Sequence, residues 1–505
     1  MFTRLFIANR GEIAVRIARA AAGLGIASVA AFSEDDAASP HVLAATAGGA
    51  LPGRGPRAYL DGAAVIAAAK AAGCDALHPG YGFLSENAAF AADCAAAGIT
   101  FVGPAPAALT LFGDKAAARA AAQAAGVPVL GGTGAVSLAE AQKAFAKLGA
   151  VMIKALAGGG GRGMRIVTRA ADLAEAYARA SSEAQAAFGD GRVYLEAYMS
   201  RARHIEVQLI GDRHGGLTHA GTRECSLQRR HQKLIEIAPA HLPAGTETAL
   251  LDAALRLGRA AQYDSLGTVE FLLDADDADN FAFIEMNPRL QVEHTVTEEI
   301  TGIDLVATQI RIAAGASLTE LALPSGHRGV AVQARVNAES VSADGALRAS
   351  HAAITRYEAP SGPGIRVDGF ARTGTQPNPA FDSLLAKVIA RGADLRGALA
   401  LLDRALGECV IDGPATNTGF LRALIAHPDV AGDRMTTSLV DAITADLVAT
   451  LPVNEAAVAQ VVPEGLVGVP APLSGLVVAV SVAVAAHAGE TLRPPIRSPS
   501  SVWSR

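Results

Sequence analysis

The feature that most restricts this chain is a pair of strand-like segments that carry acidic side chains among apolar ones. Residues 267–273 and 281–286 read as two strands joined by a polar turn, which predicts a β-hairpin. Side chains alternate along a strand, so Glu285 and Asn287 share one face, within reach of Glu270 on the neighbouring strand. Two carboxylates and an amide oxygen are hard ligands that suit Mg²⁺ shared with nucleotide phosphates. The alternative is a hairpin whose acids pair with nearby arginines, although charges in apolar strands are rarely buried without a specific partner.

A glycine-rich segment is the second feature. Residues 157–163 (Ala-Gly-Gly-Gly-Gly-Arg-Gly) lie between the strand-like segments 150–153 and 165–167, with Lys154 directly before them. Such a loop lets backbone N–H groups approach phosphate oxygens, while the lysine supplies positive charge. It lacks the Gly-Lys-Ser/Thr ending of a Walker loop, and no helix follows it directly. Flexible surface hairpins show the same glycine run, so the loop gains weight from the acidic hairpin in the same chain.

A basic segment is the third feature. Residues 223–233 (Arg-Glu-Cys-Ser-Leu-Gln-Arg-Arg-His-Gln-Lys) carry five basic or imidazole side chains, which by themselves would fit a nucleic-acid patch. The chain as a whole has a net charge of −6 and no other strong basic run, so a site for phosphate or bicarbonate fits better than nucleic acid. Just before this segment, Glu206 and Gln208 have a plain interpretation as strand residues that face solvent.

In this order, the three clusters closely resemble the biotin carboxylase family of ATP-grasp enzymes. The resemblance extends from the N-terminus to about residue 445 and rests on several motifs together, none of which is specific alone. The other motifs that carry it are Ile-Ala-Asn-Arg-Gly-Glu-Ile-Ala at 7–14, His-Pro-Gly-Tyr-Gly-Phe-Leu-Ser-Glu-Asn at 78–87, Gly-Asp-Lys at 113–115, Gln-Ala-Arg-Val-Asn-Ala-Glu at 333–339 and Ile-Asp-Gly-Pro-Ala-Thr-Asn at 411–417.

We therefore expect an α/β protein with an ATP-grasp fold, a Rossmann-like N-terminal domain and an α/β C-terminal subdomain. The N-terminal segments agree, since a strand at 4–8, a helix opened by Gly11 and a strand at 28–32 form a β-α-β unit without a dinucleotide fingerprint. At 505 residues the chain is too long for one core, and two to four subdomains are expected. The predicted divisions are an N-terminal domain at 1–112, an ATP-grasp domain at 113–325 with a lid at about 131–202, a C-terminal domain at 330–445, a linker at 446–467 and a tail at 468–505.

The tail resembles the first half of a biotinyl carrier domain. The sequence Ala-Pro-Leu-Ser-Gly-Leu-Val-Val at 471–478 fits that pattern, but no Ala-Met-Lys-Met hairpin follows, and the chain has no lysine after Lys387. Half of a β-sandwich would leave its strand edges unpaired. We expect residues from about 455 onward to be poorly ordered, as a truncated or frame-shifted copy of a longer carboxylase.

The resemblance implies that ATP, bicarbonate and biotin, free or on a carrier in trans, are converted to ADP, phosphate and carboxybiotin through carboxyphosphate. Mg²⁺ or Mn²⁺ would accompany the ATP. The implied residues are Lys233, Arg289, Glu293 and Arg335 for catalysis; Lys115, Lys154, Gly160, Gly161, Glu196, Ala197, Tyr198, Met199, His204, Gln228, His231 and Val292 for binding; and Glu270, Glu285 and Asn287 for the metal.

The resemblance also implies individual roles. Bicarbonate would lie between Lys233, Arg289 and the backbone of Val292, and Glu293 would be the base that deprotonates it. Arg335 would stabilise the enolate-like oxygen that develops on biotin, as donors do in an oxyanion hole. Two alternatives stay open, namely another ATP-grasp carboxylate or carbamate ligase, and a non-catalytic remnant that only binds nucleotide.

Partners and location are expected on the same basis. A biotinylated carrier domain and a carboxyltransferase subunit would act with the chain, a homodimer is expected, and the final carboxyl acceptor is left open. Four cysteines without metal-ligand spacing, together with a charged N-terminus and no signal peptide, predict a reducing cytoplasm. No apolar run approaches the roughly 20 residues that span a bilayer, so no membrane contact is expected.

Overall fold

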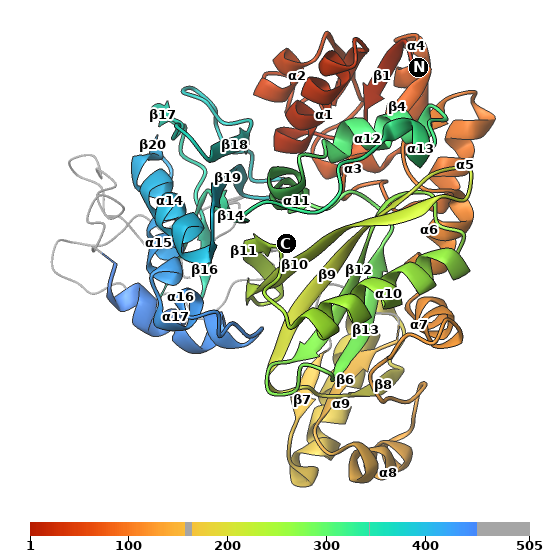
Figure 1. The fold of residues 1–505 in the computed structure, drawn as a ribbon, viewed down its shortest axis with the longest axis vertical. Coiled ribbons are helices and arrows are strands. Elements are labelled where there is room, and N and C mark those ends of the chain that lie inside the picture. The colour runs from red at the N-terminus through yellow and green to blue at the C-terminus, as the bar shows by residue number, and fades with distance from the viewer. Residues whose placement is uncertain (157–163, 343, 452–505) are drawn as a thin grey trace, which may run out of the picture. The chain divides into compact units, whose positions relative to one another are not determined.

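The first elements of the chain form a five-stranded parallel sheet, which lies at the top of Figure 1. The computed structural model describes residues 1–156, 164–342 and 344–451. The helix predicted from Gly11 is confirmed, and Ile13 and Ile17 lie on its buried face. In their order across the sheet the strands are β3 (Ala47–Ala50), β2 (Ala27–Phe32), β1 (Arg4–Ile7), β4 (Ala76–His78) and β5 (Thr100–Phe101), and the helices of this part are α1 (Gly11–Gly23), α2 (Pro40–Ala44), α3 (Pro56–Leu60), α4 (Gly62–Ala71), α5 (Ala88–Ala96) and α6 (Pro106–Gly113).

An eight-stranded antiparallel sheet forms the centre of the molecule. The predicted acidic hairpin is confirmed as its first two strands. The order across this sheet is β13 (Phe281–Asn287), β12 (Ser265–Asp274), β9 (Ala202–Gly211), β10 (Leu217–Arg229), β11 (Gln232–Ala238), β14 (Val330–Asn337), β19 (Leu384–Gly392) and β18 (Ile365–Gly369), and the helices beside its first half are α7 (Lys115–Ala124), α10 (Ala244–Ala260), α11 (His294–Thr301), α12 (Leu305–Ala313) and α13 (Leu318–Leu321).

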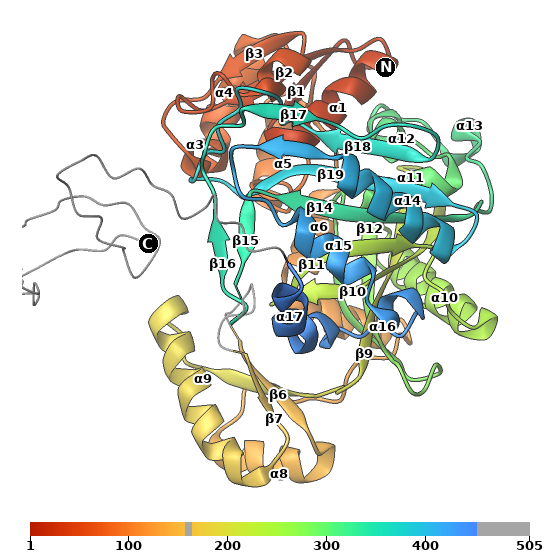
Figure 2. The same cartoon turned by 90° about the vertical axis from the view of Figure 1, so that its left-hand side faces the viewer.

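A small separate sheet carries the strands on either side of the glycine loop, and Figure 2 shows it projecting below the central sheet. Helix α8 begins with a capping box, in which Ser137 and Glu140 satisfy each other's backbone N–H groups. The elements are β7 (Arg165–Val167), β6 (Val151–Ala155) and β8 (Val193–Ala197), in that order across the sheet, with α8 (Leu138–Leu148), α9 (Leu173–Phe188) and a 3-10 turn at Ala170–Asp172.

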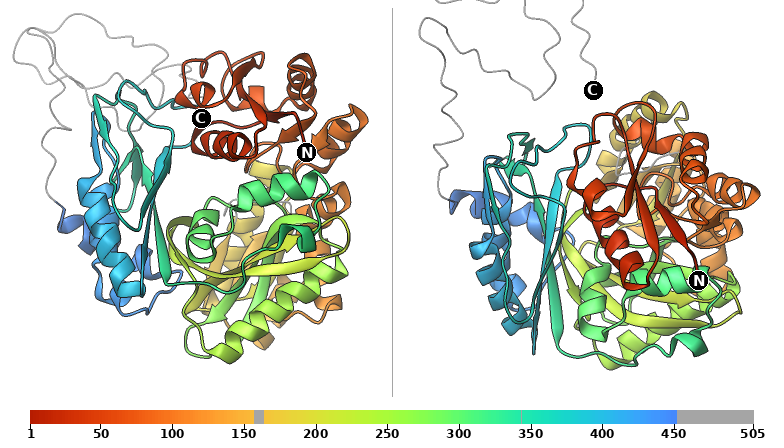
Figure 3. Two further views of the ribbon diagram at one scale, coloured as in Figure 1. Left: turned by 45° about the horizontal axis from the view of Figure 1, so that its top comes forward. Right: turned by 90° about the horizontal axis from the view of Figure 1, so that it is seen from above.

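The last part of the described chain completes the central sheet and covers it with helices. Figure 3 shows α14 lying along β14 and β19, where Leu399, Leu402 and Leu406 are buried in the same core as Val332 and Val388. The elements not yet named are β15 (Glu339–Val341), β16 (Leu347–Ala349), β17 (Arg356–Glu358), β20 (Val410–Asp412), α14 (Leu395–Glu408), α15 (Thr418–Ile425), α16 (Pro428–Ala431) and α17 (Leu439–Ala449).

The central sheet crosses one of the predicted domain boundaries. Strand β11 belongs to the predicted ATP-grasp domain and β14 to the predicted C-terminal domain, yet residues 235–238 of β11 pair with residues 331–334 of β14, with Ile235 opposite Ala334. Helix α17 also reaches Ala449, so the first residues of the predicted 446–467 linker are helical. The rest of that linker, the 468–505 tail and the glycine loop at 157–163 lie outside the described residues.

No helix within residues 1–156, 164–342 and 344–451 combines the length and the apolar character that a membrane span requires.

Candidate active site

Three carboxylates lie side by side on one face of the central sheet. Glu270 on β12 stands opposite Glu285 on β13 and, on its other side, opposite Glu206 on β9. The prediction that the hairpin acids share a face is therefore confirmed, and Asn287 joins them because its Nδ2 donates to Glu270 Oε1 at 2.6 Å. Adjacent strands are about 4.8 Å apart, so such a row concentrates negative charge.

Lys233 neutralises the centre of this row. Its ammonium donates to Glu293 Oε1 at 2.6 Å, to Glu206 Oε2 at 2.8 Å and to Glu270 Oε1 at 3.4 Å. Burial disfavours the charged form of Lys233, but the acidic groups around it raise its pKa well above the usual value. For Glu206, burial also opposes the charge, and the coulombic fields of Arg223 and Lys233 overcome it and lower the pKa to about 2. Lys233 and Glu206 are thus both ionised at neutral pH.

The sequence interpretation of Glu206 and Gln208 as solvent-facing residues is wrong. Both are completely buried, because β9 lies between β12 and β10 in the interior of the sheet. Arg223 is buried with them; it pairs with Glu206 through Nε and donates from Nη1 to Gln208 Oε1 at 2.9 Å. Glu206 and Arg223 therefore support the row of carboxylates, a role that the sequence analysis did not assign.

The basic segment at 223–233 is not one anion site. Arg223 is buried and paired with Glu206, whereas Arg230 and His231 lie in the turn between β10 and β11 and are exposed. Of these residues, Arg223 and Lys233 reach the carboxylates, Arg223 through Glu206 and Lys233 through Glu206, Glu270 and Glu293. The predicted five-residue cluster is therefore reduced to a buried arginine and a partly buried lysine.

Glu293 connects Lys233 to Arg335. Its side chain is 1% exposed, and Oε2 accepts a hydrogen bond from Arg335 Nη2 at 3.1 Å. Burial raises the pKa of Glu293, but the charges of Lys233 and Arg335 outweigh this effect and lower it overall. Arg335 is also held by the buried Glu236, whose Oε1 accepts from its Nε at 2.6 Å. Two of the predicted catalytic cations thus share one carboxylate.

Arg289 reaches the same cluster through Gln291. Its Nη1 donates to Gln291 Oε1 at 2.7 Å and its Nη2 to Asn287 Oδ1 at 3.0 Å. Gln291 Nε2 in turn donates to Glu270 Oε1 at 3.0 Å. The fourth predicted catalytic residue therefore lies beside the others, and part of its guanidinium faces Glu86 at 3.3 Å.

The predicted nucleotide residues lie on several elements. His204 belongs to the buried cluster, since its Nε2 lies 2.6 Å from Glu270 Oε2 and its Nδ1 lies 3.5 Å from Gln228 Nε2. Lys154 pairs with Glu196 across β6 and β8 of the small sheet, whereas His231 lies in the turn between β10 and β11 and Val292 in the loop before α11. The backbone N–H groups of Ala197 and Tyr198 bond to Gly131 and Ala150, Met199 is half-buried, and Gly160 and Gly161 lie outside the described residues.

Lys115 occupies the first position of α7 and is exposed. Its position is that of an ordinary lysine in the first turn of a helix. However, its charge also acts on Glu285, whose pKa it lowers against the larger effects of burial and Glu270. Lys115 therefore faces the acidic hairpin.

The residues present fit a divalent cation. Burial first, and then the neighbouring Glu270, raise the pKa of Glu285, and the charge of Lys115 opposes this rise only in part, so a cation bound beside Glu270 and Glu285 would stabilise their ionised forms. The ligand atoms of His204, Glu206 and Glu270 also lie within 4.8 Å of one another, but Arg223 and Lys233 already neutralise Glu206. The oxygen atoms of Glu270, Glu285 and Asn287 are thus the better set for Mg²⁺.

A test of this metal site is Glu285→Gln. Without ligands the variant should unfold at a higher temperature than the wild-type chain, because it removes a buried carboxylate whose pKa is raised. Mg²⁺ added with ADP should stabilise the wild-type chain more than ADP alone, and the variant should lose most of that increment. Thermal unfolding followed by calorimetry measures both effects.

The control for that test is Asp277→Asn, which removes an exposed carboxylate from the turn of the same hairpin. It should keep the full Mg²⁺ increment. An equal loss in both variants would contradict the assignment of Glu285 to the metal.

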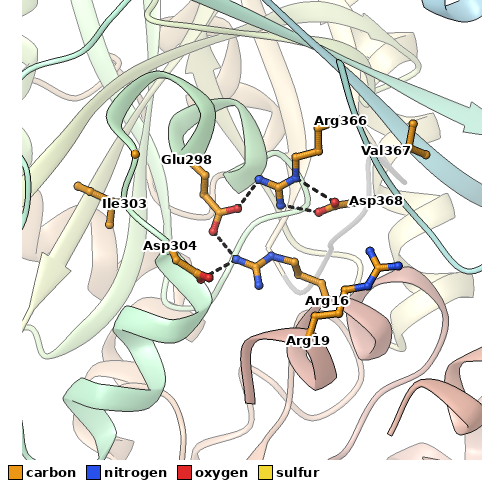
Figure 4. Close-up of a pocket in the computed structure, with 9 residues that line it drawn as sticks. Arg16, Arg19, Glu298, Ile303, Asp304, Arg366, Val367 and Asp368 are labelled. Carbon is orange, nitrogen blue, oxygen red and sulfur yellow. Dashed lines mark hydrogen bonds and ion pairs between the residues drawn. The ribbon is translucent and has the colours of Figure 1, made fainter. Parts of the chain in front are cut away.

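A cavity of about 460 Å³ lies elsewhere, between α1, α11, α12 and β18 (Figure 4). Most of its charged lining is already paired, since Arg16 donates to Glu298 at 2.8 Å and Arg366 donates to Asp368 at 2.7 Å. None of the predicted catalytic residues lines it. The carboxylate cluster, not this cavity, is therefore the candidate active site.

Family models match the three parts of the chain. Residues 1–109 match the biotin carboxylase N-terminal domain, residues 114–321 match the ATP binding domain of the carbamoyl-phosphate synthase L chain, and residues 333–442 match the biotin carboxylase C-terminal domain.

Two relatives show how far the likeness extends. The chain is 43% identical over 446 residues to a biotin carboxylase from Nostoc sp., covering 87% of this chain and 98% of that protein. It is 46% identical over 451 residues to pyruvate carboxylase 1 from Caenorhabditis elegans, covering 87% of this chain but only 38% of that protein. The chain thus spans less than half the length of the pyruvate carboxylases that it matches.

Solved structures agree with the fold. The biotin carboxylase of Campylobacter jejuni superposes with a TM-score of 0.82 at 40% identity, covering 88% of this chain and 99% of that chain. A dimer of the biotin carboxylase domain of Hydrogenobacter thermophilus 2-oxoglutarate carboxylase, in complex with MgADP, ADP and bicarbonate, gives 0.82 at 38% identity with the same coverage. The predicted α/β ATP-grasp fold is confirmed, and the chain belongs to the biotin carboxylase family.

Proposed function

We propose that this chain uses ATP to transfer the carboxyl group of bicarbonate to biotin. The observation that carries the proposal is the series of part-buried contacts from Lys233 through Glu293 to Arg335, which lies beside the acidic hairpin. In this series of contacts, Lys233 is suited to bind bicarbonate and Arg335 is suited to bind a second substrate. Glu293 contacts both of these residues. The solved relative with MgADP and bicarbonate supports the same substrates.

Bicarbonate is a poor carboxyl donor, and phosphorylation by ATP makes it a labile carboxyphosphate. This transfer depends more on charge neutralisation and alignment than on covalent help. Lys233 and Arg289 would hold the anion together with the N–H of Val292, and the carboxylate of Glu293 would accept its proton. Glu293 is suited to this step because its lowered pKa keeps it ionised at neutral pH.

Phosphate binding would fall to Lys115, at the start of α7, and to Lys154, on β6 of the small sheet. Glu270, Glu285 and Asn287 would hold Mg²⁺, which when bound offsets the negative charge of the phosphates. The repulsion between Glu270 and Glu285 would decrease in the same state.

Biotin must lose the proton of its ring N–H before it accepts the carboxyl group, and the phosphate that leaves carboxyphosphate would take up that proton. Negative charge then develops on the carbonyl oxygen of biotin. Arg335 would stabilise that charge by donating hydrogen bonds. The guanidinium is oriented in advance, because Glu236 and Glu293 fix two of its edges. Orientation in advance lowers the cost of binding a transient charge.

Arg289→Lys is expected to raise the KM for bicarbonate about tenfold, with a smaller change in the KM for ATP, because lysine lacks the planar fork that matches an oxyanion. The contacts with Gln291 and Asn287 use two different nitrogens of that fork. Initial rates of ADP release at varied bicarbonate measure the effect. Arg259→Lys, on the exposed side of α10, serves as the control and should leave both KM values unchanged.

The decisive experiment is an ATPase assay with and without bicarbonate and free biotin. ADP release that requires bicarbonate and rises with biotin supports the proposal. Activity driven by ammonia or an amine would favour another ATP-grasp ligase. Binding of nucleotide without any turnover would favour the non-catalytic alternative.

We further propose that the chain works with a biotinylated carrier domain and a carboxyltransferase, and that it forms a homodimer. The relatives include multidomain carboxylases, and the Hydrogenobacter thermophilus domain is a dimer, which supports these partners without identifying the final acceptor. Light scattering after size-exclusion chromatography would decide the oligomeric state. A mass of 51.3 kDa in solution would contradict the dimer.

A further inference from the structure

A completely buried lysine lies outside every role assigned so far. Lys387 is 0% exposed and lies on β19, opposite Arg335 on β14. Its ammonium makes two contacts across the protein, to Glu12 Oε2 at 3.1 Å and to the main-chain oxygen of Val292 at 3.0 Å. A buried ammonium is costly unless it is paired and hydrogen-bonded, so these two contacts account for how the charge is tolerated.

The contact with Val292 acts on the loop that joins β13 to α11 and carries Glu293. Helix α11 begins at His294 with Glu293 as its N-cap, so the carbonyl of Val292 lies outside the helix and receives no hydrogen bond from it. A peptide unit is planar, and a hydrogen bond to that oxygen therefore fixes the whole plane that joins Val292 to Glu293. Glu293 is the residue whose carboxylate meets Lys233 and Arg335.

The contact with Glu12 links Lys387 to the N-terminal part of the chain. Glu12 lies in the first turn of α1, is 3% exposed, and also accepts a hydrogen bond from the hydroxyl of Tyr81. Burial raises the pKa of Glu12, and the charge of Lys387 and the hydrogen bond from Tyr81 oppose that rise. The ammonium of Lys387 is thus held by Glu12 of the N-terminal part. It in turn holds the loop before α11 through the main-chain oxygen of Val292.

We propose that Lys387 is a positioning residue, which fixes the Val292–Glu293 peptide plane and with it the Cα of Glu293, so that the Glu293 carboxylate is held beside Lys233 and Arg335, where bicarbonate would bind. The inference rests on the proposed function and adds a residue to it. A purely structural ion pair between β19 and α1 would need no contact with the loop. The hydrogen bond to the Val292 oxygen is the observation that distinguishes the two roles.

The experiment compares the wild-type chain with Lys387→Met, which keeps the length of the side chain and removes its charge. We expect kcat/KM for bicarbonate to fall about 100-fold, because small displacements of reacting groups have effects of this size, while the dissociation constant of ADP stays within about threefold. Hydrogen–deuterium exchange should rise in the segment from Leu290 to Ile300. This second readout does not depend on activity.

Two further variants complete the design. Glu12→Gln keeps the volume and the acceptor for Tyr81 but removes the counter-charge of Lys387, so it should change both readouts in the same direction by less. Asp36→Asn is the matched control, because Asp36 is 5% exposed and pairs with Arg10 in the N-terminal part, away from the loop. It should lower the stability without changing exchange in the segment 290–300.

The outcomes are distinct. Unchanged exchange and an unchanged kcat/KM for bicarbonate in folded Lys387→Met, or in Glu12→Gln if the first variant does not fold, would overturn the proposal. An equal effect of Asp36→Asn would also overturn it, because the effect would then follow stability alone. If the wild-type chain shows no bicarbonate-dependent ATPase, the proposed function fails, and the exchange experiment still decides whether Lys387 fixes the loop.

Discussion

Lys233→Met is expected to lower bicarbonate-dependent turnover by about 10² to 10³, the loss typical of removing one donor to a developing charge. The lysine is the shared partner of Glu206, Glu270 and Glu293, and its ammonium lies within 3.4 Å of all three. Methionine fills the space but leaves these carboxylates facing one another. ADP release at saturating ATP and bicarbonate measures the loss.

The same variant should be less stable by about 3 to 5 kcal/mol at neutral pH, because one partner of a buried ion cluster is gone. The pH dependence has a definite sign. In the wild-type chain the pKa of Glu206 is lowered to about 2, so its stabilising effect is present above its unfolded pKa and is lost as the pH falls through about 2. Without Lys233 the carboxylates protonate more readily.

The stability deficit of Lys233→Met should therefore be larger at about pH 8 than at about pH 5, where protonation relieves the repulsion. Urea unfolding at the two pH values tests this. Lys70→Met, which replaces an exposed lysine in the last turn of α4, should be silent at both. A deficit that is independent of pH would contradict the account of the cluster.

Glu293→Gln is expected to reduce turnover by about 10² to 10⁴, the usual contribution of a general base, while the affinity for ATP stays the same. The amide retains the shape of the side chain but can no longer accept the proton of bicarbonate. It also places an N–H₂ group among the donors Lys233 and Arg335, which lie 2.6 Å and 3.1 Å from the carboxylate oxygens.

Single-turnover ADP release, measured beside nucleotide binding by calorimetry, separates the two effects of Glu293→Gln. The matched control is Glu299→Gln on the same helix, since Glu299 is partly exposed and pairs only with Arg366 and not with the cluster. A normal turnover in Glu293→Gln would transfer the role of base to another group, of which Glu206 is the nearest ionised candidate.

Much of the fold and of the site follows from local sequence patterns. The acidic hairpin was predictable because alternation along two adjacent strands fixes the face of each side chain, and the structure places Glu270 opposite Glu285. The helix from Gly11 and the parallel N-terminal sheet were predictable for the same reason, because apolar periodicity reports directly on burial.

The residues that were missed depend on strand order, which alternation does not reveal. Glu206 alternates with apolar neighbours as a surface strand residue would, but β9 is an interior strand and both of its faces are covered. Lys387 carried a usable signal, since a single lysine in the apolar run Leu-Leu-Ala-Lys-Val-Ile-Ala at 384–390 requires a buried partner. Its partners, Glu12 and Val292, are too distant in sequence to be inferred.

The pairing of β11 with β14 has a practical consequence for dissecting this protein. A fragment that stops at residue 325 would expose residues 235–238 of β11 as an open edge, with unsatisfied N–H and C=O groups. Such an edge invites pairing with a second molecule, so the fragment should aggregate rather than behave as an autonomous nucleotide-binding module. Co-expression with residues 326–451 would supply the missing strand and is the route by which split halves should regain solubility.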